Sequence, residues 1–213
     1  MTARKLGFFD RFIGEIDKAI KVLTLPTLAR RDLAASSTQE PALNDADRKE
    51  SGRLMRVNHA GEVAAQALYQ GQALVARDAS LEMTLRRAAA EEADHLAWCR
   101  QRLGELAARP SLLNPVWYFG SFLIGTVAGT LGDTVSLGFI AETEKQVEAH
   151  LRDHLRRLPL ADERSRAVIT QMTHDEIAHG QTAIAMGGKS LPFPVVLAMR
   201  WSSRAMTRGS YWL

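Results

Sequence analysis

Along most of the chain, apolar residues recur every three or four positions, the spacing that places them on one face of a helix. The two-residue alternation typical of half-buried strands is missing from the sequence. Four long patterns of this kind cover residues 46–77, 80–108, 134–157 and 162–186, with breaks rich in proline, glycine and charge between them. The pattern predicts an all-α protein with a core enclosed by four long helices.

A shorter amphipathic segment, from Phe8 to Leu23, precedes these patterns. The stretch that follows, "LPTLARRDLAASSTQEPALND" (25–45), carries the prolines, serines and charges typical of a linker. We therefore divide the chain into an N-terminal amphipathic segment with its linker, residues 1–44, and a helical domain, residues 45–213.

Composition narrows the class of protein. With 213 residues, 46% of them hydrophobic, the chain is long enough for one large core. The net charge of +3 comes without zinc-finger spacing or an aromatic-interleaved basic run, so we expect no nucleic-acid partner. Cys99 is the single cysteine, and acidic residues interrupt the N-terminus where a signal peptide needs an apolar core. Both features favour a reducing, cytoplasmic setting.

Each of the four long helical patterns contains one glutamate whose neighbours three, four and seven positions away are mostly apolar. These residues are Glu62, Glu92, Glu144 and Glu176. A carboxylate on the inner face of a helix costs free energy unless its charge is neutralised. Two divalent cations cancel four carboxylate charges, so the pattern predicts a dinuclear metal site inside the bundle.

The spacing of these glutamates repeats in the two halves of the chain, 92 − 62 = 30 residues and 176 − 144 = 32 residues. Each pair ends in Glu-x-x-His, with His95 and His179 as the imidazoles. One Glu from each of two helices and Glu-x-x-His from each of the other two is the pattern of ferritin-like di-iron bundles. Carboxylate and imidazole ligands suit iron or manganese better than zinc, so we expect two Fe ions per chain, with a Mn/Fe pair as an alternative.

Two further acids have ligand spacing as well. Glu91 and Asp175 each lie four residues before the histidine of their motif. We prefer Glu92 and Glu176 as ligands, because both halves then use a glutamate at the same offset on the apolar stripe. Glu91 and Asp175 are then acids outside the ligand set.

Four stretches resemble the demethoxyubiquinone hydroxylases of ubiquinone biosynthesis. They are "RVNHAGEVAAQALYQGQ" (56–72), "EEADHLAWC" (91–99), "AGTLGDTVSLGFIAETEKQVEAHLRDHLRRL" (128–158) and "HDEIAHGQTA" (174–183). The resemblance implies terminal ligands at Glu62 and Glu144, bridging carboxylates at Glu92 and Glu176, and imidazole ligands at His95 and His179. It also implies that His150 lies near the quinone ring, while Leu151 stands where many relatives have tyrosine.

The family resemblance implies an O2-dependent di-iron monooxygenase that hydroxylates the ring of a demethoxyubiquinone-type intermediate. Its partners would be a polyprenyl quinone, O2, an electron donor that is either a reductase or NADH, and other proteins of ubiquinone biosynthesis. Two other classes of protein are alternatives, one that uses the same metal ligands and one that binds no metal. One is a ferritin-like protein that oxidises iron or detoxifies peroxide, and the other is a metal-free membrane scaffold of a quinone-biosynthetic complex.

The charge-free run from Pro110 to Gly132 has the length and composition of a transmembrane helix and contains the close-packing spacing Gly125-x-x-x-Gly129. However, the expected ligands precede and follow this run, and a single crossing would place them on opposite sides of a bilayer. We therefore expect a long crossover connection and helix within a four-helix bundle, with an apolar face that rests on lipid or covers the core.

The C-terminal stretch has a basic edge, because Arg200, Arg204 and Arg208 recur every four residues beside the apolar Val196 and Trp201. Such an amphiphile suits an anionic membrane surface, and equally a terminal helix docked on the bundle with a solvated arginine edge. We expect peripheral association with the cytoplasmic face of the cell membrane.

Overall fold

The computed structural model describes residues 8–25, 28–32 and 41–213. In these residues the chain forms helices without strands, so the all-α prediction is confirmed. The helices are α1 (Phe8–Thr24), α2 (Asp45–Val75), α3 (Ala79–Glu105), α4 (Asn114–Thr130), α5 (Asp133–Arg157), α6 (Glu163–Ala185) and α7 (Phe193–Trp212).

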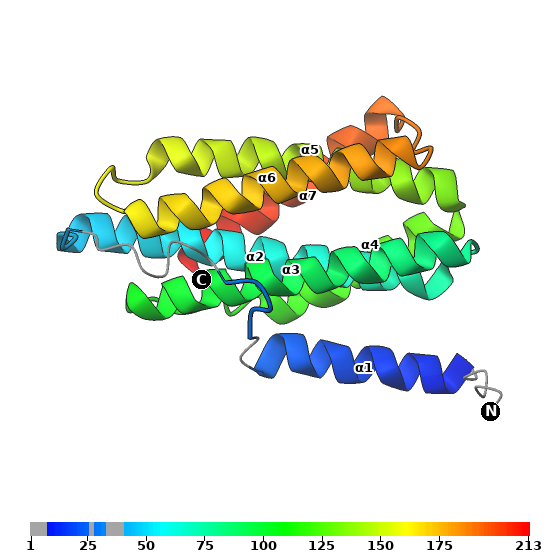
Figure 1. Ribbon diagram of the computed structural model, residues 1–213, viewed down its shortest axis with the longest axis horizontal. Helices are drawn as coiled ribbons and strands as arrows, with labels where there is room; N and C mark the ends of the chain where they lie inside the picture. Colours follow the sequence, from blue (N-terminus) through cyan, green and yellow to red (C-terminus); the bar gives the residue numbers. More distant parts are fainter. Residues whose placement is uncertain (1–7, 26–27, 33–40) are drawn as a thin grey trace.

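The four long helices α2, α3, α5 and α6 form the bundle. In Figure 1, α5 and α6 lie side by side over the layer that contains α2 and α3. The helix α4 runs along α2 and completes the long connection from α3 to α5. This arrangement confirms the predicted ferritin-like four-helix bundle with a long crossover.

Short polar side chains cap the first turns of α2 and α3. Asn44 accepts a hydrogen bond from the Asp47 N–H at the start of α2, and Asp78 accepts one from the Ser80 N–H at the start of α3. The helix α3 ends at Glu105, three residues before the predicted limit of 108, because Ala107 adopts a φ of 52°. Position 107, where this backbone conformation favours glycine, is an alanine, so the sequence does not mark the end of the helix there.

The apolar run from Pro110 to Gly132 forms α4, which packs closely against α2. A Cβ atom on Gly125 would overlap the carbonyl oxygen of Leu68, and one on Gly129 would overlap the side chain of Val75. Glycine therefore permits the close approach of the two helices. Among the helices of the described residues, none is long and apolar enough to cross a bilayer.

The terminal helices lie on the outside of the bundle. Ala19 of α1 packs in an apolar cluster with Val63, Ala67, Leu96 and Tyr118. At the other end, α7 lies along α2, and its Ser210 hydroxyl accepts a hydrogen bond from the Trp117 indole at 3.0 Å. Both amphipathic segments predicted from the sequence are helices.

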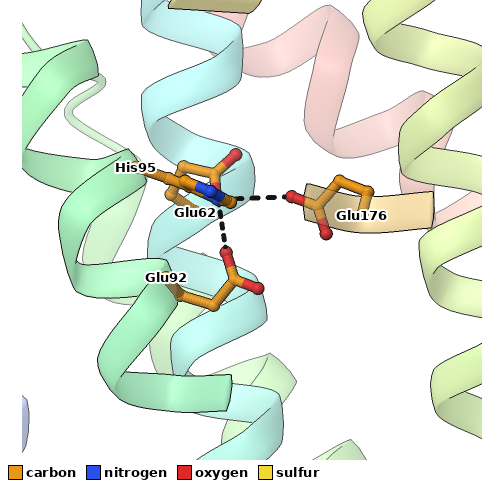
Figure 2. Close-up of side chains that lie close together, drawn as sticks. All are labelled: Glu62, Glu92, His95 and Glu176. Atoms are coloured by element: carbon orange, nitrogen blue, oxygen red, sulfur yellow. Dashed lines mark hydrogen bonds and ion pairs between the residues drawn. The ribbon is translucent and has the colours of Figure 1, made fainter. Parts of the chain in front are cut away.

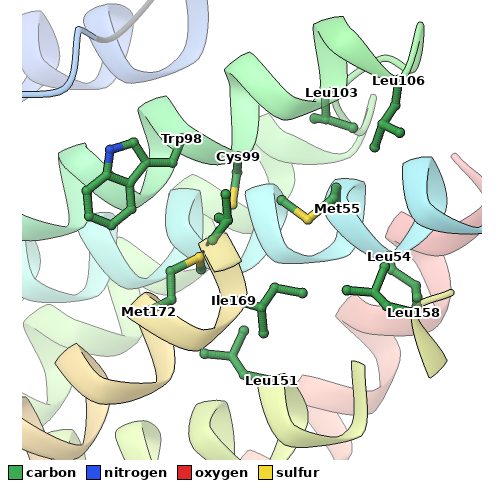
Figure 3. Packing of buried hydrophobic residues seen from close by; sticks show 11 residues of the cluster. Leu54, Met55, Trp98, Cys99, Leu103, Leu106, Leu151, Leu158, Ile169 and Met172 are labelled. Atoms are coloured by element: carbon green, nitrogen blue, oxygen red, sulfur yellow. Dashed lines mark hydrogen bonds between the residues drawn. The ribbon is translucent and has the colours of Figure 1, made fainter. Parts of the chain in front are cut away.

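Two apolar clusters fill the bundle interior on either side of the four glutamates. Figure 3 shows one cluster, in which side chains from α2, α3, α5 and α6 converge around Cys99. The Cys99 sulfur lies 3.7 Å from the sulfur of Met172, so the thiol is part of this core. The other cluster contains Tyr69, Leu85 and Ile140. The acidic residues therefore occupy a polar layer within an apolar interior.

Candidate metal centre

The four predicted glutamates and two histidines come together between the two layers of the bundle. Their ligand atoms form two groups, and within each group all atoms lie within 4.8 Å of one another. One group comprises Glu62, Glu92, His95 and Glu176, which Figure 2 shows converging from three helices. The other comprises Glu92, Glu144, Glu176 and His179. Glu92 and Glu176 belong to both groups, the geometry that two bridging carboxylates require.

Both imidazoles turn Nδ1 toward the carboxylates. The Nδ1 atom of His95 lies 2.9 Å from Glu92 Oε2 and 3.3 Å from Glu176 Oε1. The Nδ1 atom of His179 lies 3.2 Å from Glu92 Oε1 and 3.5 Å from Glu176 Oε2. The two Glu-x-x-His motifs therefore face each other across the shared pair of carboxylates.

The opposite nitrogen of each ring is held by an acid from the facing helix. His95 Nε2 on α3 lies 2.8 Å from Asp175 Oδ2 on α6, and His179 Nε2 on α6 lies 2.8 Å from Glu91 Oε2 on α3. Neither Asp175 nor Glu91 belongs to the two groups of ligand atoms found in the described residues. A carboxylate on the outer nitrogen fixes the orientation of a metal-binding imidazole, so these acids have a positioning geometry.

The cluster balances its charge through the histidines. Burial raises the pKa of Glu62 and of Glu144 well above the usual range. Burial also acts to raise the pKa of Glu92, but the facing His95 and His179 outweigh it and lower that pKa. Burial opposes protonation of His179, yet the surrounding glutamates raise its pKa to about 12. Without a cation, these shifts favour the protonated forms of Glu62 and Glu144 and an ionised Glu92 paired with the two imidazoles.

Several buried ligand atoms make no hydrogen bond of good geometry among the described residues, although His179 Nδ1 lies within 3.5 Å of Glu92 Oε1 and Glu176 Oε2. They are Glu62 Oε2, Glu92 Oε1, Glu144 Oε2, Glu176 Oε2 and His179 Nδ1. Buried polar atoms without a partner cost free energy, and these five converge on the interior of the cluster. A set of carboxylate oxygens and imidazole nitrogens without a thiolate fits iron or manganese. The residues present therefore fit a pair of divalent cations.

Two contacts of this centre were not predicted from the sequence. The Tyr69 hydroxyl on α2 donates a hydrogen bond to Glu144, and burial raises the pKa of Tyr69 well above its usual range. Its position seven residues after Glu62, on the same helix face, was the available signal. The second contact comes from Arg31, within the stretch that we read as a linker, and its guanidinium lies 2.9 Å from Asp175 Oδ2. Arg30 and Arg31 of this stretch are hydrogen-bonded to Asp94 on α3.

Two other histidines from the sequence motifs lie outside the cluster. The His150 ring packs against His154 at a centroid distance of 3.9 Å, beside a pocket that Arg157 and Trp212 also line. Burial lowers the pKa of His150 to about 4, so this ring is neutral near pH 7. His59 lies 3.3 Å from the side-chain nitrogen of Asn114 through Nδ1, a contact between α2 and α4.

A cavity of about 320 Å³ adjoins the His179 side of the cluster. Its lining includes Tyr69, Leu85, Leu137 and Ile140, with Glu91 and His179 at the polar end. The cavity is thus an apolar space that touches a predicted ligand, its positioning acid and the tyrosine bound to Glu144. Such a combination of apolar walls and few polar groups is typical of small-molecule sites.

Comparison with known proteins decides the family. Residues 49–210 match the family model described as "Ubiquinone biosynthesis protein COQ7". The chain belongs to this family. The matched range contains the four glutamates and two histidines of the cluster, whereas α1 and Leu28–Asp32 precede it.

Similar members of the COQ7 family cover nearly the whole chain. A protein of Nitrosospira multiformis named 3-demethoxyubiquinol 3-hydroxylase is 55% identical over 96% of this chain and 98% of its own length. Proteins of the same name from Ralstonia pickettii and Bordetella pertussis are 55% and 52% identical, over 95% and 99% of this chain and 98% and 95% of their own lengths. The predicted family is therefore confirmed.

Proposed function

We propose that the chain is a monooxygenase that adds a hydroxyl group to the ring of a demethoxyubiquinol, using O2 and a pair of iron ions held in the bundle. The observation that carries the proposal is the pair of ligand groups that share Glu92 and Glu176, found in a chain of this family. Family membership and the relatives' shared name favour hydroxylation over iron storage and over a metal-free scaffold.

In this proposal, Glu62 and His95 would hold one iron, Glu144 and His179 would hold the other, and Glu92 and Glu176, which belong to both groups, would be ligands of the pair. A bound iron pair supplies the redox chemistry that activates O2. The protein orients the ligands: Asp175 and Glu91 fix the two imidazole rings, each through a contact of 2.8 Å to Nε2. The Tyr69 hydroxyl fixes Glu144 and keeps a proton next to that carboxylate.

The quinol ring would reach the centre through the cavity on the His179 side. His95 is fully buried, whereas the side chain of His179 is 11% exposed and borders the cavity. The apolar walls formed by Leu85, Leu137 and Ile140 suit a quinone ring and exclude water from the space beside the centre. The electron donor, a reductase or NADH, remains part of the proposal without an assigned site.

Hydroxylation of a short-tailed demethoxyubiquinol by iron-loaded protein tests this function. With labelled dioxygen, we expect product that carries one labelled oxygen, and almost none from a Glu92→Ala, Glu176→Ala double variant. A Glu82→Ala, Glu163→Ala variant changes two partly or fully exposed acids on the same helices and serves as the matched control. Equal product from the double variant and the parent would refute the assignment.

We also propose that the protein binds peripherally to the cytoplasmic face of the cell membrane. Side chains of Phe119 and Leu123 on α4 are 60% and 64% exposed, and those of Ile13 and Ile20 on the neighbouring α1 are 63% and 55% exposed. Transfer of a large apolar side chain from water into lipid contributes roughly 1.5–3 kcal/mol. Such a surface would bring a polyprenyl substrate to the enzyme directly from the bilayer, and other proteins of ubiquinone biosynthesis with it.

Sedimentation with lipid vesicles tests the membrane proposal. We expect binding to vesicles that contain anionic lipid, since Arg200, Arg204 and Arg208 are exposed on α7. A Phe119→Ser, Leu123→Ser variant should bind more weakly and keep its iron. Unchanged binding by this variant would exclude α4 as the membrane-facing surface.

A further inference from the structure

Arg31 precedes the bundle in sequence, yet its guanidinium joins two helices beside the metal centre. Its Nε donates to Asp94 Oδ2 on α3 at 3.0 Å, and its Nη2 donates to Asp175 Oδ2 on α6 at 2.9 Å. The same oxygen of Asp175 lies 2.8 Å from Nε2 of His95. The Arg31 Nη2 atom itself lies 3.5 Å from His95 Nε2, so the guanidinium adjoins both a predicted metal ligand and the carboxylate that holds it.

The position of this guanidinium is set by the chain on either side of it. The Arg30 N–H donates to Asp94 Oδ1 at 2.6 Å, and the Trp98 indole donates to the Arg31 carbonyl at 3.1 Å. The guanidinium also lies over the Trp98 ring, 4.9 Å from its centroid. Because backbone groups anchor the segment, Arg31 is held in place even though its side chain is 41% exposed.

Arg31 also balances charge that the bundle alone would leave poorly compensated. The side chain of Asp94 is 4% exposed and that of Asp175 is 17% exposed. Without Arg31, the described partners of Asp175 would be His95 and Gln171, and Gln171 lies on the same helix as Asp175. Arg31 therefore adds a contact from a further segment to a carboxylate that would otherwise be held by His95 on α3 and by its own helix.

The equivalent acid in the other half of the centre has a weaker support. Glu91 holds His179 and pairs with Arg87 at 3.0 Å, four residues earlier on the same helix. The Arg87 side chain is 82% exposed, so water competes strongly for this ion pair. The contacts of Arg31 to Asp94 and Asp175, which we call the Arg31 clamp, therefore distinguish the His95 half of the centre from the His179 half.

We propose that Arg31 is a positioning residue for one of the two metal ions. It holds Asp175 in the orientation that keeps the His95 ring fixed with Nδ1 toward the shared carboxylates. The segment before α2 is thereby part of the metal centre. This inference rests on the proposed function to the extent that the centre binds two cations, and it is independent of the substrate.

Anaerobic titration of the full-length, metal-free protein with ferrous iron against a competing chelator tests the clamp. We expect Arg31→Ala to weaken one ferrous ion by about tenfold and to leave the other at the parent affinity, since loss of an outer contact typically costs 10–100-fold in metal affinity. Arg30→Ala removes the same charge from the neighbouring residue but keeps the backbone bond to Asp94, and should bind both ions as the parent does.

Mössbauer spectra add a readout that general destabilisation would not produce. In Arg31→Ala the signal of one iron should change while that of the other stays as in the parent. Arg31→Lys should give a change intermediate between those of the parent and Arg31→Ala, because a lysine keeps the charge but lacks the planar fork of donors by which arginine contacts both carboxylates. Thermal unfolding of each metal-free variant establishes that it is folded.

Parent affinity for both ions in Arg31→Ala, or an equal loss at both ions, would overturn the clamp. A parent that binds no iron would overturn it as well. A parent that binds two irons with the expected asymmetry in Arg31→Ala, yet hydroxylates no quinol, would refute the proposed function and leave the clamp standing.

Discussion

The His95 half and the His179 half of the centre use the same motif in different surroundings. In both, Glu-x-x-His turns Nδ1 inward, and an acid from the facing helix holds Nε2. His95 is fully buried beside Trp98, whose indole donates a hydrogen bond to the Arg31 carbonyl. His179 adjoins an apolar cavity of about 320 Å³. The repeated motif determines the geometry within each half, whereas the surroundings determine that the His95 half is shielded and that the His179 half adjoins a cavity.

Removal of a shared carboxylate should erase the difference between the halves. We expect Glu176→Ala to lose both irons, because Glu176 belongs to both groups of ligand atoms, whereas Glu62→Ala should weaken one. The expected loss of affinity in Glu176→Ala exceeds about a hundredfold, the upper range for loss of an outer contact. Iron analysis after desalting measures this, and retention of one tightly bound iron in Glu176→Ala would contradict the sharing.

Acidification should weaken both halves together. Ligands bind a cation only after they lose their protons, and in the metal-free cluster the pKa values of Glu62 and Glu144 are raised by burial while that of His179 is raised to about 12 by the facing glutamates. Iron affinity should therefore rise with pH, and binding should release protons into a weakly buffered solution. Chelator competition from pH 6 to pH 8 measures it, and a pH-independent affinity would be inconsistent with this electrostatic account.

Substitution of the two acids that hold the imidazoles, Asp175 and Glu91, should affect the two halves of the centre unequally. Asp175→Asn should lower the affinity for one iron by about 10–100-fold, and Glu91→Gln should have a smaller effect. The reason is that Asp175 is clamped by Arg31, whereas Glu91 depends on the exposed Arg87. The same chelator competition applies to both variants. A larger loss of iron affinity in Glu91→Gln than in Asp175→Asn would contradict the inference that the His95 half is the more firmly held.

A narrower cavity should affect only the substrate side. Thr182 lines the cavity at an exposed position, so Thr182→Phe should raise the KM for a demethoxyubiquinol by about tenfold without loss of iron. Gln181→Phe, an exposed neighbour on the same helix, is the matched control. Steady-state kinetics with both variants would show whether the substrate enters on this side. Equal KM values for Thr182→Phe and the parent would indicate that the substrate enters elsewhere.

Sequence periodicity predicted the bundle and the inward position of the four glutamates and two histidines, because both depend on local helix geometry. Glu62 and Glu144 lie on apolar stripes that can be read without knowledge of the partner helix. The pairing of His95 with Asp175, or of His179 with Glu91, joins residues 80 and 88 positions apart, and no local pattern encodes it.

The Arg31 contact escaped prediction for a related reason. Its stretch has linker composition, and its partners lie 63 and 144 residues away. Tyr69 was visible on the Glu62 stripe, but the stripe alone could not show that its hydroxyl reaches Glu144 on α5.

The most direct test of the central claim is the iron content of the protein after anaerobic addition of ferrous iron and removal of the excess. We expect about two irons per chain in the parent and almost none in the Glu92→Ala, Glu176→Ala double variant. A parent without bound iron, or a double variant that retains two, would contradict a di-iron centre built on these shared carboxylates.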